Sequence, residues 1–357
     1  MSLPARGLLL LCLSLAVPLA AHCDRVQARA DPHAAAGDGC TARIEPGEEL
    51  QKALDRALRD GRPATVCLAA GEYRLASTLT ITRDDVTLRG AGNATVLVLQ
   101  PGTQAPVLLV GDPDHPAPAR AIHNVTIERL KIVGAGGQGS EFATGRSYLT
   151  NNGVTVRSGR GVIVRELDVS NCRSAGILTE YSSEDVTIEN NTVSTATWDG
   201  ISLNRALRTR VVGNTLHDNV AAGITVEHMV DSTIENNTMR QNGTHGIYLS
   251  DAYRNRIDGN HFVGNKGAGV FLTCSIRSRE PLRCWDDSMS QNNTFENNEF
   301  IGNGYAYMVA PDVQAHCNRP GLVANLSRGD LFERNPSNEP DWNTYGRCLQ
   351  YVDARSR

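Results

Sequence analysis

The sequence contains few aromatic residues, few methionines and no excess of positive charge. Aromatics make up 5% of its 357 residues, five residues are Met, and the formal net charge is −4. A core with so few rings must be built from Val, Ile, Leu and small residues, as in proteins made of stacked repeats. The negative balance argues against nucleic acid as a partner. The scarcity of Met argues against a metal-handling protein, which would need clusters of Met, His and Cys.

No hydrophobic run of membrane-spanning length occurs, so we expect no transmembrane segment. Residues 1–21 are typical of a secretory signal peptide, because Arg6 precedes an apolar stretch over residues 7–17. The sequence Leu19-Ala20-Ala21 suits signal cleavage. We therefore expect a secreted or periplasmic protein, with a flexible leader over residues 22–45.

The cysteines predict disulfides. Nine are present, and eight remain once Cys12 leaves with the signal peptide. An even count in an exported chain indicates disulfide pairing. The pairs that we favour are Cys274–Cys284, Cys317–Cys348 and Cys40–Cys67.

A repeat dominates the middle of the chain. A glycine followed by alternating apolar residues recurs at spacings of 23, 24, 23, 23 and 23 residues, at Gly153, Gly176, Gly200, Gly223, Gly246 and Gly269. A second pattern of short alternating segments begins at Val125 and returns at Val162 and Val186. Each repeat therefore holds at least two short strands, and neither can bury its apolar face alone. Stacked coils can bury them, because each strand then pairs in parallel with its copy in the next coil.

Asparagines in the turns support stacked coils. One column of equivalent positions contains Asn191, Asn214, Asn237, Asn260 and Asn298, and a second contains Asn219, Asn242, Asn265 and Asn303. Stacked asparagines can hydrogen-bond to one another along the stack, as amide ladders do in cross-β assemblies. The sequence thus predicts an all-β fold, a single-stranded right-handed parallel β-helix. A helix expected over residues 48–60 would cap its N-terminal end. We expect one β-helix domain over residues 46–310 and a C-terminal cap over residues 311–357.

With these repeats, the chain resembles the right-handed parallel β-helix proteins of the pectin lyase-like superfamily. That group includes pectate lyases, alginate lyases, alginate C5-epimerases and periplasmic NosD-like proteins. The resemblance covers about residues 45–310, and its beginning rests on Leu50-Gln51-Lys52-Ala53-Leu54 and Val86-Thr87-Leu88-Arg89-Gly90. It implies an elongated surface that suits a polysaccharide, and it does not single out one activity.

Alternation along each strand predicts which side chains face outward. Because neighbouring coils lie about 4.8 Å apart, the coils after Gly200, Gly223 and Gly246 should bring one group of polar side chains together. This group contains Asp199, Asn204, Arg205, Glu227, His228, His245, Tyr248 and Asp251. Outward polar residues are also what any soluble solenoid needs. A His and a Tyr beside two carboxylates and a long insertion nevertheless make this the best candidate site.

The predicted chemistry is proton removal from C5 of a uronate residue, by a lyase or a C5-epimerase. It needs a base, a neutraliser for the carboxylate and an acid. We expect His245 to be the base, Tyr248 the acid and Arg205 the neutraliser, with Glu227 or Asp199 orienting the histidine. Expected substrate-binding residues are His228, Asp251, Asn204, Glu180, Tyr181, Arg277, Arg279 and Arg283. The last three lie in the insertion over residues 274–290, and their guanidinium groups suit an anionic polysaccharide.

Alternatives remain open on the same scaffold. A glycoside hydrolase would use Asp199 and Glu227, or Glu180 and Glu227, as paired carboxylates. A non-catalytic carbohydrate-binding protein or a NosD-like periplasmic accessory protein would need no such pair. No cofactor is required, although Asp199, Glu227 and Asp251 are the carboxylates that would hold Ca²⁺. We expect a monomer.

Overall fold

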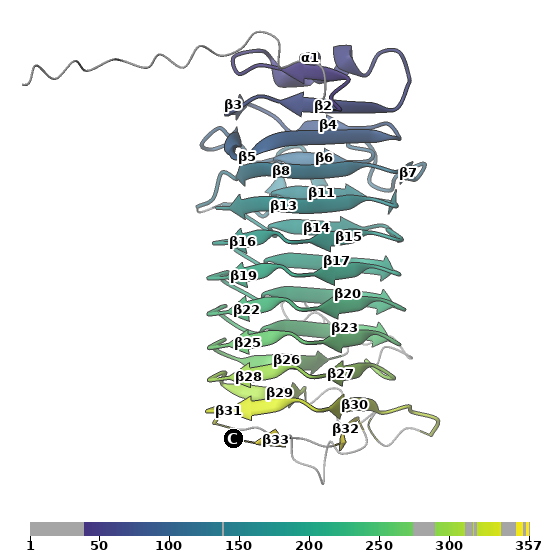
Figure 1. Cartoon of the computed structure of the whole chain (residues 1–357), viewed down its shortest axis with the longest axis vertical. Helices are drawn as coiled ribbons and strands as arrows, with labels where there is room; N and C mark the ends of the chain where they lie inside the picture. The colour runs from purple at the N-terminus through teal and green to yellow at the C-terminus, as the bar shows by residue number, and fades with distance from the viewer. Residues whose placement is uncertain are drawn as a thin grey trace, which may run out of the picture. The chain divides into compact units, whose positions relative to one another are not determined.

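The computed structural model describes residues 39–137, 139–273, 290–310, 317, 320–336, 348–352 and 355–356. Residues from Cys40 onward belong to one compact unit. Within it, successive coils stack from helix α1 (Leu50–Ala57) at one end to strand β32 (Leu349–Val352) at the other (Figure 1). All pairings between coils are parallel, so the predicted parallel β-helix is confirmed. No helix in the described residues is long and apolar enough to span a bilayer.

One sheet is formed by the strands that follow the repeat glycines and by their neighbours at both ends. We call it the glycine sheet. Its strands are β4 (Leu79–Ile81), β6 (Leu108–Val110), β11 (Val154–Arg157), β14 (Ile177–Glu180), β17 (Ile201–Leu207), β20 (Ile224–Val230), β23 (Ile247–Tyr253), β26 (Ala268–Thr273) and β29 (Tyr305–Val309).

Most of the remaining strands form two further ladders, which share the long strands β5 (Val86–Leu99), β8 (Thr126–Val133) and β13 (Ile163–Ser170). The first ladder also has β1 (Ala42–Ile44), β2 (Ala64–Leu68), β15 (Thr187–Glu189), β18 (Arg210–Val212), β21 (Thr233–Glu235), β24 (Arg256–Asp258), β27 (Thr294–Glu296), β30 (Asn325–Arg328) and β32. The second also has β3 (Gly71–Leu75), β16 (Thr192–Ser194), β19 (Thr215–His217), β22 (Thr238–Arg240), β25 (His261–Val263), β28 (Glu299–Ile301), β31 (Leu331–Glu333) and β33 (Arg355–Ser356).

Close contact between coils explains the glycine column. A Cβ atom added at Gly246 would lie 2.6 Å from the carbonyl oxygen of Gly269 in the next coil, and it would also meet the ring of Phe262. The equivalent glycines meet the next coil in the same way. A side chain larger than that of glycine at these positions would push two coils apart. Close packing of the coils therefore requires the glycine that recurs every 23 residues or so.

The asparagine columns form the predicted ladders. Asn237 accepts from the backbone N–H and the side-chain amide of Asn214, both at 2.9 Å, and donates to Asn260 at 3.0 Å. The chain of bonds continues through Asn298 to Asp330, and the second column continues from Asn303 to Asn335. A third ladder, which the sequence analysis did not predict, joins Asn255, Asn293 and Asn325. These amides satisfy buried backbone groups at each turn.

The ladders extend past the expected domain limits. Strand β1, which lies inside the expected leader, pairs with β2. Strands β30 to β33, which lie after residue 310, continue the two ladders by parallel pairing. The repeat is hard to see there because insertions separate the strands. Helix α1 packs on β1, β2 and β4 and buries Leu50, Ala53 and Leu54.

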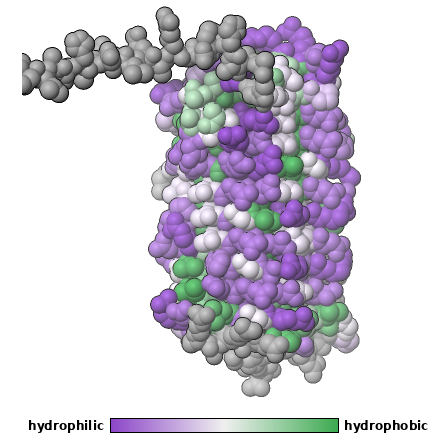
Figure 2. All heavy atoms as spheres, in the orientation of Figure 1, coloured by the Kyte–Doolittle hydropathy of each residue, from purple (hydrophilic) through white to green (hydrophobic). Residues whose placement is uncertain are grey.

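Two predicted disulfides are present, Cys40–Cys67 and Cys317–Cys348. The third predicted pair, Cys274–Cys284, lies outside the described residues. Cys172 is a buried free thiol. One continuous apolar core runs through the stack from Ile44 to Leu349. On the face drawn in Figure 2, hydrophobic residues lie in small separate patches among polar ones.

The insertion over residues 134–152 forms a hairpin of β9 (Phe142–Ala143) and β10 (Arg146–Thr150). Ala143 and Leu149 pack with Leu109, on the outer side of the glycine sheet. A short parallel pair, β7 (Ile122–His123) and β12 (Gly159–Arg160), completes the described strands. The hairpin therefore covers part of the outer side of the glycine sheet at β6.

Candidate functional site

The glycine sheet turns sharply at one equivalent residue in successive coils. Ser158, Tyr181, Arg205, His228 and Asp251 all have positive φ, between 53° and 65°. In β20, this conformation breaks the alternation of the strand. Glu227 and His228 are therefore both partly exposed, between the buried Val226 and Met229. The backbone thus presents two consecutive polar side chains on one surface.

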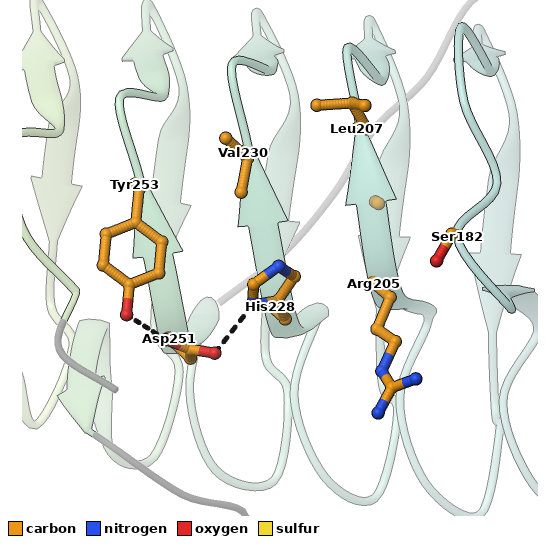
Figure 3. A pocket seen from close by; sticks show the side chains of 8 residues that line it. Ser182, Arg205, Leu207, His228, Val230, Asp251 and Tyr253 are labelled. Carbon is orange, nitrogen blue, oxygen red and sulfur yellow. Dashed lines mark hydrogen bonds and ion pairs between the residues drawn. The ribbon is translucent and has the colours of Figure 1, made fainter. Parts of the chain in front are cut away.

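A pocket of about 480 Å³ lies beside this row of turns, and we call it the histidine pocket. Strands β17, β20 and β23 supply most of its walls (Figure 3). Its described lining residues are Ser182, Arg205, Ala206, Leu207, His228, Val230, Asp251 and Tyr253. The pocket brings together three of the residues that the sequence predicted, from three successive coils.

His228 is held by a carboxylate. Its Nδ1 atom lies 2.8 Å from Oδ2 of Asp251, and the hydroxyl of Tyr253 donates to the other oxygen of the same carboxylate. Figure 3 shows Asp251 between these two partners. The Asp251 side chain is 4% exposed, whereas that of His228 is 41% exposed. Because a carboxylate only accepts, Nδ1 carries the proton in the neutral ring, and Nε2 is then the nitrogen with the lone pair.

Arg205 lies one coil before His228, in the same row of turns. Its side chain is exposed, and no other group in the described ranges forms a hydrogen bond or ion pair with its guanidinium. Most arginines on the neighbouring surfaces are paired, as Arg254 is with Asp231 at 2.7 Å. An arginine that borders a pocket without an internal partner can bind a carboxylate in the bidentate manner.

A second cavity of about 260 Å³, the acidic groove, lies over the strand bodies next to the histidine pocket. Asn204 and Glu227 line it, whereas the following residues, Arg205 and His228, line the histidine pocket. The two cavities are therefore neighbours. The described lining residues of the groove are Glu141, Thr150, Asn152, Ser174, Ala175, Leu178, Glu180, Trp198, Asp199, Ser202, Leu203, Asn204, Thr225 and Glu227.

Burial raises the pKa of both Glu180 and Asp199. Glu180 is paired at 2.6 Å with Arg157, whose side chain is fully buried. The guanidinium of Arg157 also donates to the carbonyl oxygens of Asp112, His115 and Pro116, and it lies 4.8 Å from the ring centre of Tyr181. Arg157 therefore links the loop that contains Asp112, His115 and Pro116 to the glycine sheet, and it holds the carboxylate of Glu180, a lining residue of the groove.

His245 has a structural partner that the sequence analysis did not foresee. Its Nδ1 atom accepts a hydrogen bond of 2.9 Å from the backbone N–H of Ala268. In the same column, Asn152 accepts from Ala175 N–H at 3.1 Å and Asp199 accepts from Ala222 N–H at 3.0 Å. Along this column, side chains that accept a hydrogen bond alternate with alanines. Each acceptor binds the backbone N–H of the alanine in the next coil.

This bond disfavours His245 as a base. A backbone N–H can only donate, so Nδ1 must accept and Nε2 must carry the proton of the neutral ring. Burial lowers the pKa of His245 to about 4. The ring also stacks on Phe271 at 4.4 Å between centres, and Tyr248 leans against both rings at 5.9 and 5.1 Å. These contacts are those of a packed aromatic cluster.

The structure divides the predicted site residues between separate places. Arg205, His228 and Asp251 line the histidine pocket, whereas Asn204, Glu180, Glu227 and Asp199 line the acidic groove. His245 and Tyr248 form the aromatic cluster, and Tyr181 lies over Arg157. Arg277, Arg279 and Arg283 lie outside the described residues.

Tyr253 and Trp198 line these cavities without having been predicted. Tyr253 follows its repeat glycine, Gly246, by seven positions, and Trp198 precedes Gly200 by two. Both positions lie just outside the columns that strand alternation identifies. The signal available in the sequence was a large aromatic residue at each edge of the repeat, in a chain that has few aromatics.

Comparison with known proteins supports this fold. Residues 123–324, more than half of the chain, match the family model NosD, described as "Periplasmic copper-binding protein (NosD)". No curated protein matches the chain. Among solved structures, an alginate lyase from Paenibacillus sp. str. FPU-7 is 15% identical with a TM-score of 0.59, covering 84% of this chain and 100% of its own.

Two further solved structures are similar. Pectate lyase Pel9A is 13% identical with a TM-score of 0.61, covering 90% of this chain and 80% of its own. The mannuronan C-5 epimerase AlgE4 A-module of Azotobacter vinelandii is 16% identical with a TM-score of 0.52, covering 86% and 92%. At these identities the likeness shows the fold alone.

The family description raises the question of copper. Copper sites use thiolate, thioether and imidazole ligands. Within the described ranges, no three His, Cys, Asp or Glu side chains gather closely enough to hold a metal ion. Cys172, Met229 and Met239 are buried in the core, and the other described cysteines are in disulfides. The described residues therefore do not fit a copper site.

Proposed function

The chain belongs to the NosD family, and we propose that it acts on an acidic polysaccharide by removing the C5 proton of a uronate residue, as a lyase or a C5-epimerase. The observation that carries the proposal is the hydrogen-bonded pair of His228 and Asp251 in a pocket that Arg205 also lines. The guanidinium of Arg205 has no partner among the described residues. Solved structures with this fold include an alginate lyase, a pectate lyase and a mannuronan C-5 epimerase. The family's periplasmic description agrees with a chain that carries disulfides.

His228 is the proposed base in place of His245. With the proton on Nδ1 directed at Asp251, Nε2 is the ring atom that would take a proton from a bound substrate. The buried carboxylate holds the ring in one tautomer and stabilises the imidazolium that forms. Asp251 thereby takes the orienting role that the sequence assigned to Glu227 or Asp199.

Arg205 is the proposed neutraliser. Removal of the C5 proton places negative charge on the carboxylate attached to that carbon. A guanidinium one coil from the base can pair with both carboxylate oxygens and stabilise this charge as it develops. A neutral or acidic side chain at this position would not lower the barrier in the same way.

The bond changes balance without an added reagent. In a lyase, the C5–H bond breaks, C4=C5 forms, the C4–O4 bond breaks, and the leaving O4 takes a proton. In an epimerase, a proton returns to C5 from the opposite face. Tyr248, the acid that the sequence predicted, belongs to the aromatic cluster and is not among the described lining residues of the histidine pocket. Water is therefore the proposed donor of the proton to O4 or to C5.

An assay on a panel of uronate polymers tests the proposal. Unsaturated products at the absorbance band of the C4=C5 bond indicate a lyase, a changed epimer ratio by NMR indicates an epimerase, and new reducing ends alone indicate a hydrolase. His228→Asn should abolish the activity. His261→Asn is the matched control, since His261 also contacts a carboxylate, Glu299 at 3.0 Å, but on another ladder. A chain that yields none of the three signals is not this enzyme.

A further inference from the structure

The acidic groove has a different chemical character from the histidine pocket. Trp198 contributes a half-buried ring, and its indole N–H has no partner within the described part of the chain. Asn204 donates its amide N–H to Glu227 at 2.9 Å, which leaves the amide oxygen of Asn204 without a donor in that part. An aromatic ring with a few directed polar groups is typical of a small-molecule or sugar site.

The described lining residues of the groove offer no cation to a ligand. None of these described residues is an arginine or a lysine. The nearby Arg157 is fully buried and is already bonded to Glu180 and to three carbonyl oxygens. A ligand carboxylate placed here would lie against the carboxylates of Glu180 and Asp199. Contacts between like charges in a partly buried site are costly.

Glu180 can instead recognise hydroxyl groups. One of its oxygens accepts from Arg157, and the other has no partner in the described ranges. The strand register places Glu180 beside Asn204 in the next coil, about 4.8 Å away. Two polar groups at this spacing, next to an aromatic ring, match adjacent hydroxyls on one face of a sugar.

We infer that the acidic groove binds an uncharged sugar residue, packed on Trp198 and hydrogen-bonded through Glu180 and Asn204. Asn204 and Arg205 are consecutive and line the two cavities, so the uncharged sugar and the uronate would be neighbours in one polymer chain. The substrate is therefore a heteropolymer in which a uronate adjoins an uncharged sugar. The uronate half of this inference rests on the proposed function, and the assignment of the groove rests on its own lining.

Calorimetric titration with defined oligosaccharides tests the inference. The probes are an oligosaccharide that alternates uronate and neutral hexose, and an all-uronate oligosaccharide of the same length. His228→Asn serves as the background, so that bound probes are not consumed. We expect tighter binding of the mixed probe. Trp198→Ala should weaken that binding about tenfold or more, equivalent to about 1.4 kcal/mol. Tyr305→Ala, which removes an exposed ring from β29, should leave it unchanged.

Each outcome separates the groove from the chemistry. Equal binding of both probes, with Trp198→Ala affecting neither or both alike, overturns the inference. If the mixed probe binds through Trp198 but wild-type protein turns over no polymer, the groove assignment stands and the proposed C5 chemistry fails. If all-uronate polymers are turned over and Trp198→Ala has no effect, the chemistry stands and the groove assignment fails. Absence of binding and turnover for every probe overturns both.

Discussion

The Nδ1 atom of His228 and the Oδ2 atom of Asp251 lie 2.8 Å apart, across the boundary between two coils. The 23-residue repeat places the two residues at the same position of successive coils, and their positive φ turns both side chains toward one pocket. The pair is therefore a product of the stacking itself. Its chemical importance can be tested by changing one partner at a time.

Asp251→Asn should lower kcat by about 10²- to 10⁴-fold, the range for loss of general acid–base assistance. The amide can rotate its NH₂ toward Nδ1 and favour the wrong tautomer. KM should change little, because Asp251 is buried behind the histidine. Steady-state kinetics on the best polymer of the panel measure this split. Glu299→Gln, beside His261, is the control. A kcat of Asp251→Asn within twofold of the wild-type value would contradict the orienting role of Asp251.

Arg205→Ala should lower kcat/KM on a uronate polymer by about 10²- to 10³-fold, as for removal of a group that stabilises developing charge. Arg205→Lys should recover part of the loss, because Lys keeps the charge without the bidentate geometry. Arg254→Ala, which breaks a surface pair with Asp231, should have no such effect. Equal losses at Arg205 and Arg254 would indicate a general electrostatic effect.

His245→Ala should destabilise the fold by about 1–3 kcal/mol, because the buried N–H of Ala268 would lose its acceptor. His245→Asn should retain much of that stability, since Asn152 fills the same role in its own coil. Urea denaturation measures both variants. A large loss of activity in His245→Ala with unchanged stability would restore His245 as a catalytic candidate.

The same histidine predicts a dependence of stability on pH. Burial lowers the folded-state pKa of His245 to about 4 from its ordinary value of 6.5. Between these values the unfolded chain binds the proton more readily, so folding stability should be fully present above about pH 6.5 and fall as the pH drops toward 4. The urea concentration at the midpoint of unfolding, measured at pH 7 and at pH 4.5, compares the folding stability under these two conditions. His245→Asn should reduce the difference, and an unchanged difference would assign it to other groups.

Asn237→Ala should destabilise the β-helix by about 3 kcal/mol or more. Asn237 is fully buried, accepts two bonds from Asn214 and donates to Val211 O and Asn260, so its removal leaves several buried groups unpaired. Thr192→Ala, at an exposed strand position, is the control and should change stability little. Denaturation of both variants under the same conditions makes the comparison. Equal stabilities would show that the ladder is dispensable.

Much of the fold was predictable because its requirements repeat in the sequence. Each glycine at the 23-residue period keeps a Cβ atom away from the next coil, as Gly246 does beneath Gly269, and each ladder asparagine recurs in register. These local rules act in every copy, so one sequence reveals them. Strands after residue 310 were missed because insertions interrupt the period.

The site was only partly predictable because two histidines with similar sequence positions have different partners. Both His228 and His245 fall in outward columns, but only three-dimensional contacts show that Ala268 N–H occupies Nδ1 of His245. One signal was present in the sequence. The residues before the glycines alternate an acceptor with alanine, as Asp199, Ala222, His245 and Ala268 do. Such regular alternation is typical of a structural role.

The most direct test of the central claim is the action of wild-type, His228→Asn and His261→Asn proteins on the panel of uronate polymers, followed by absorbance and NMR. We predict unsaturated or epimerised product with wild type and His261→Asn, and its loss in folded His228→Asn. Full activity of His228→Asn, or wild-type protein that changes none of these polymers, would contradict the account.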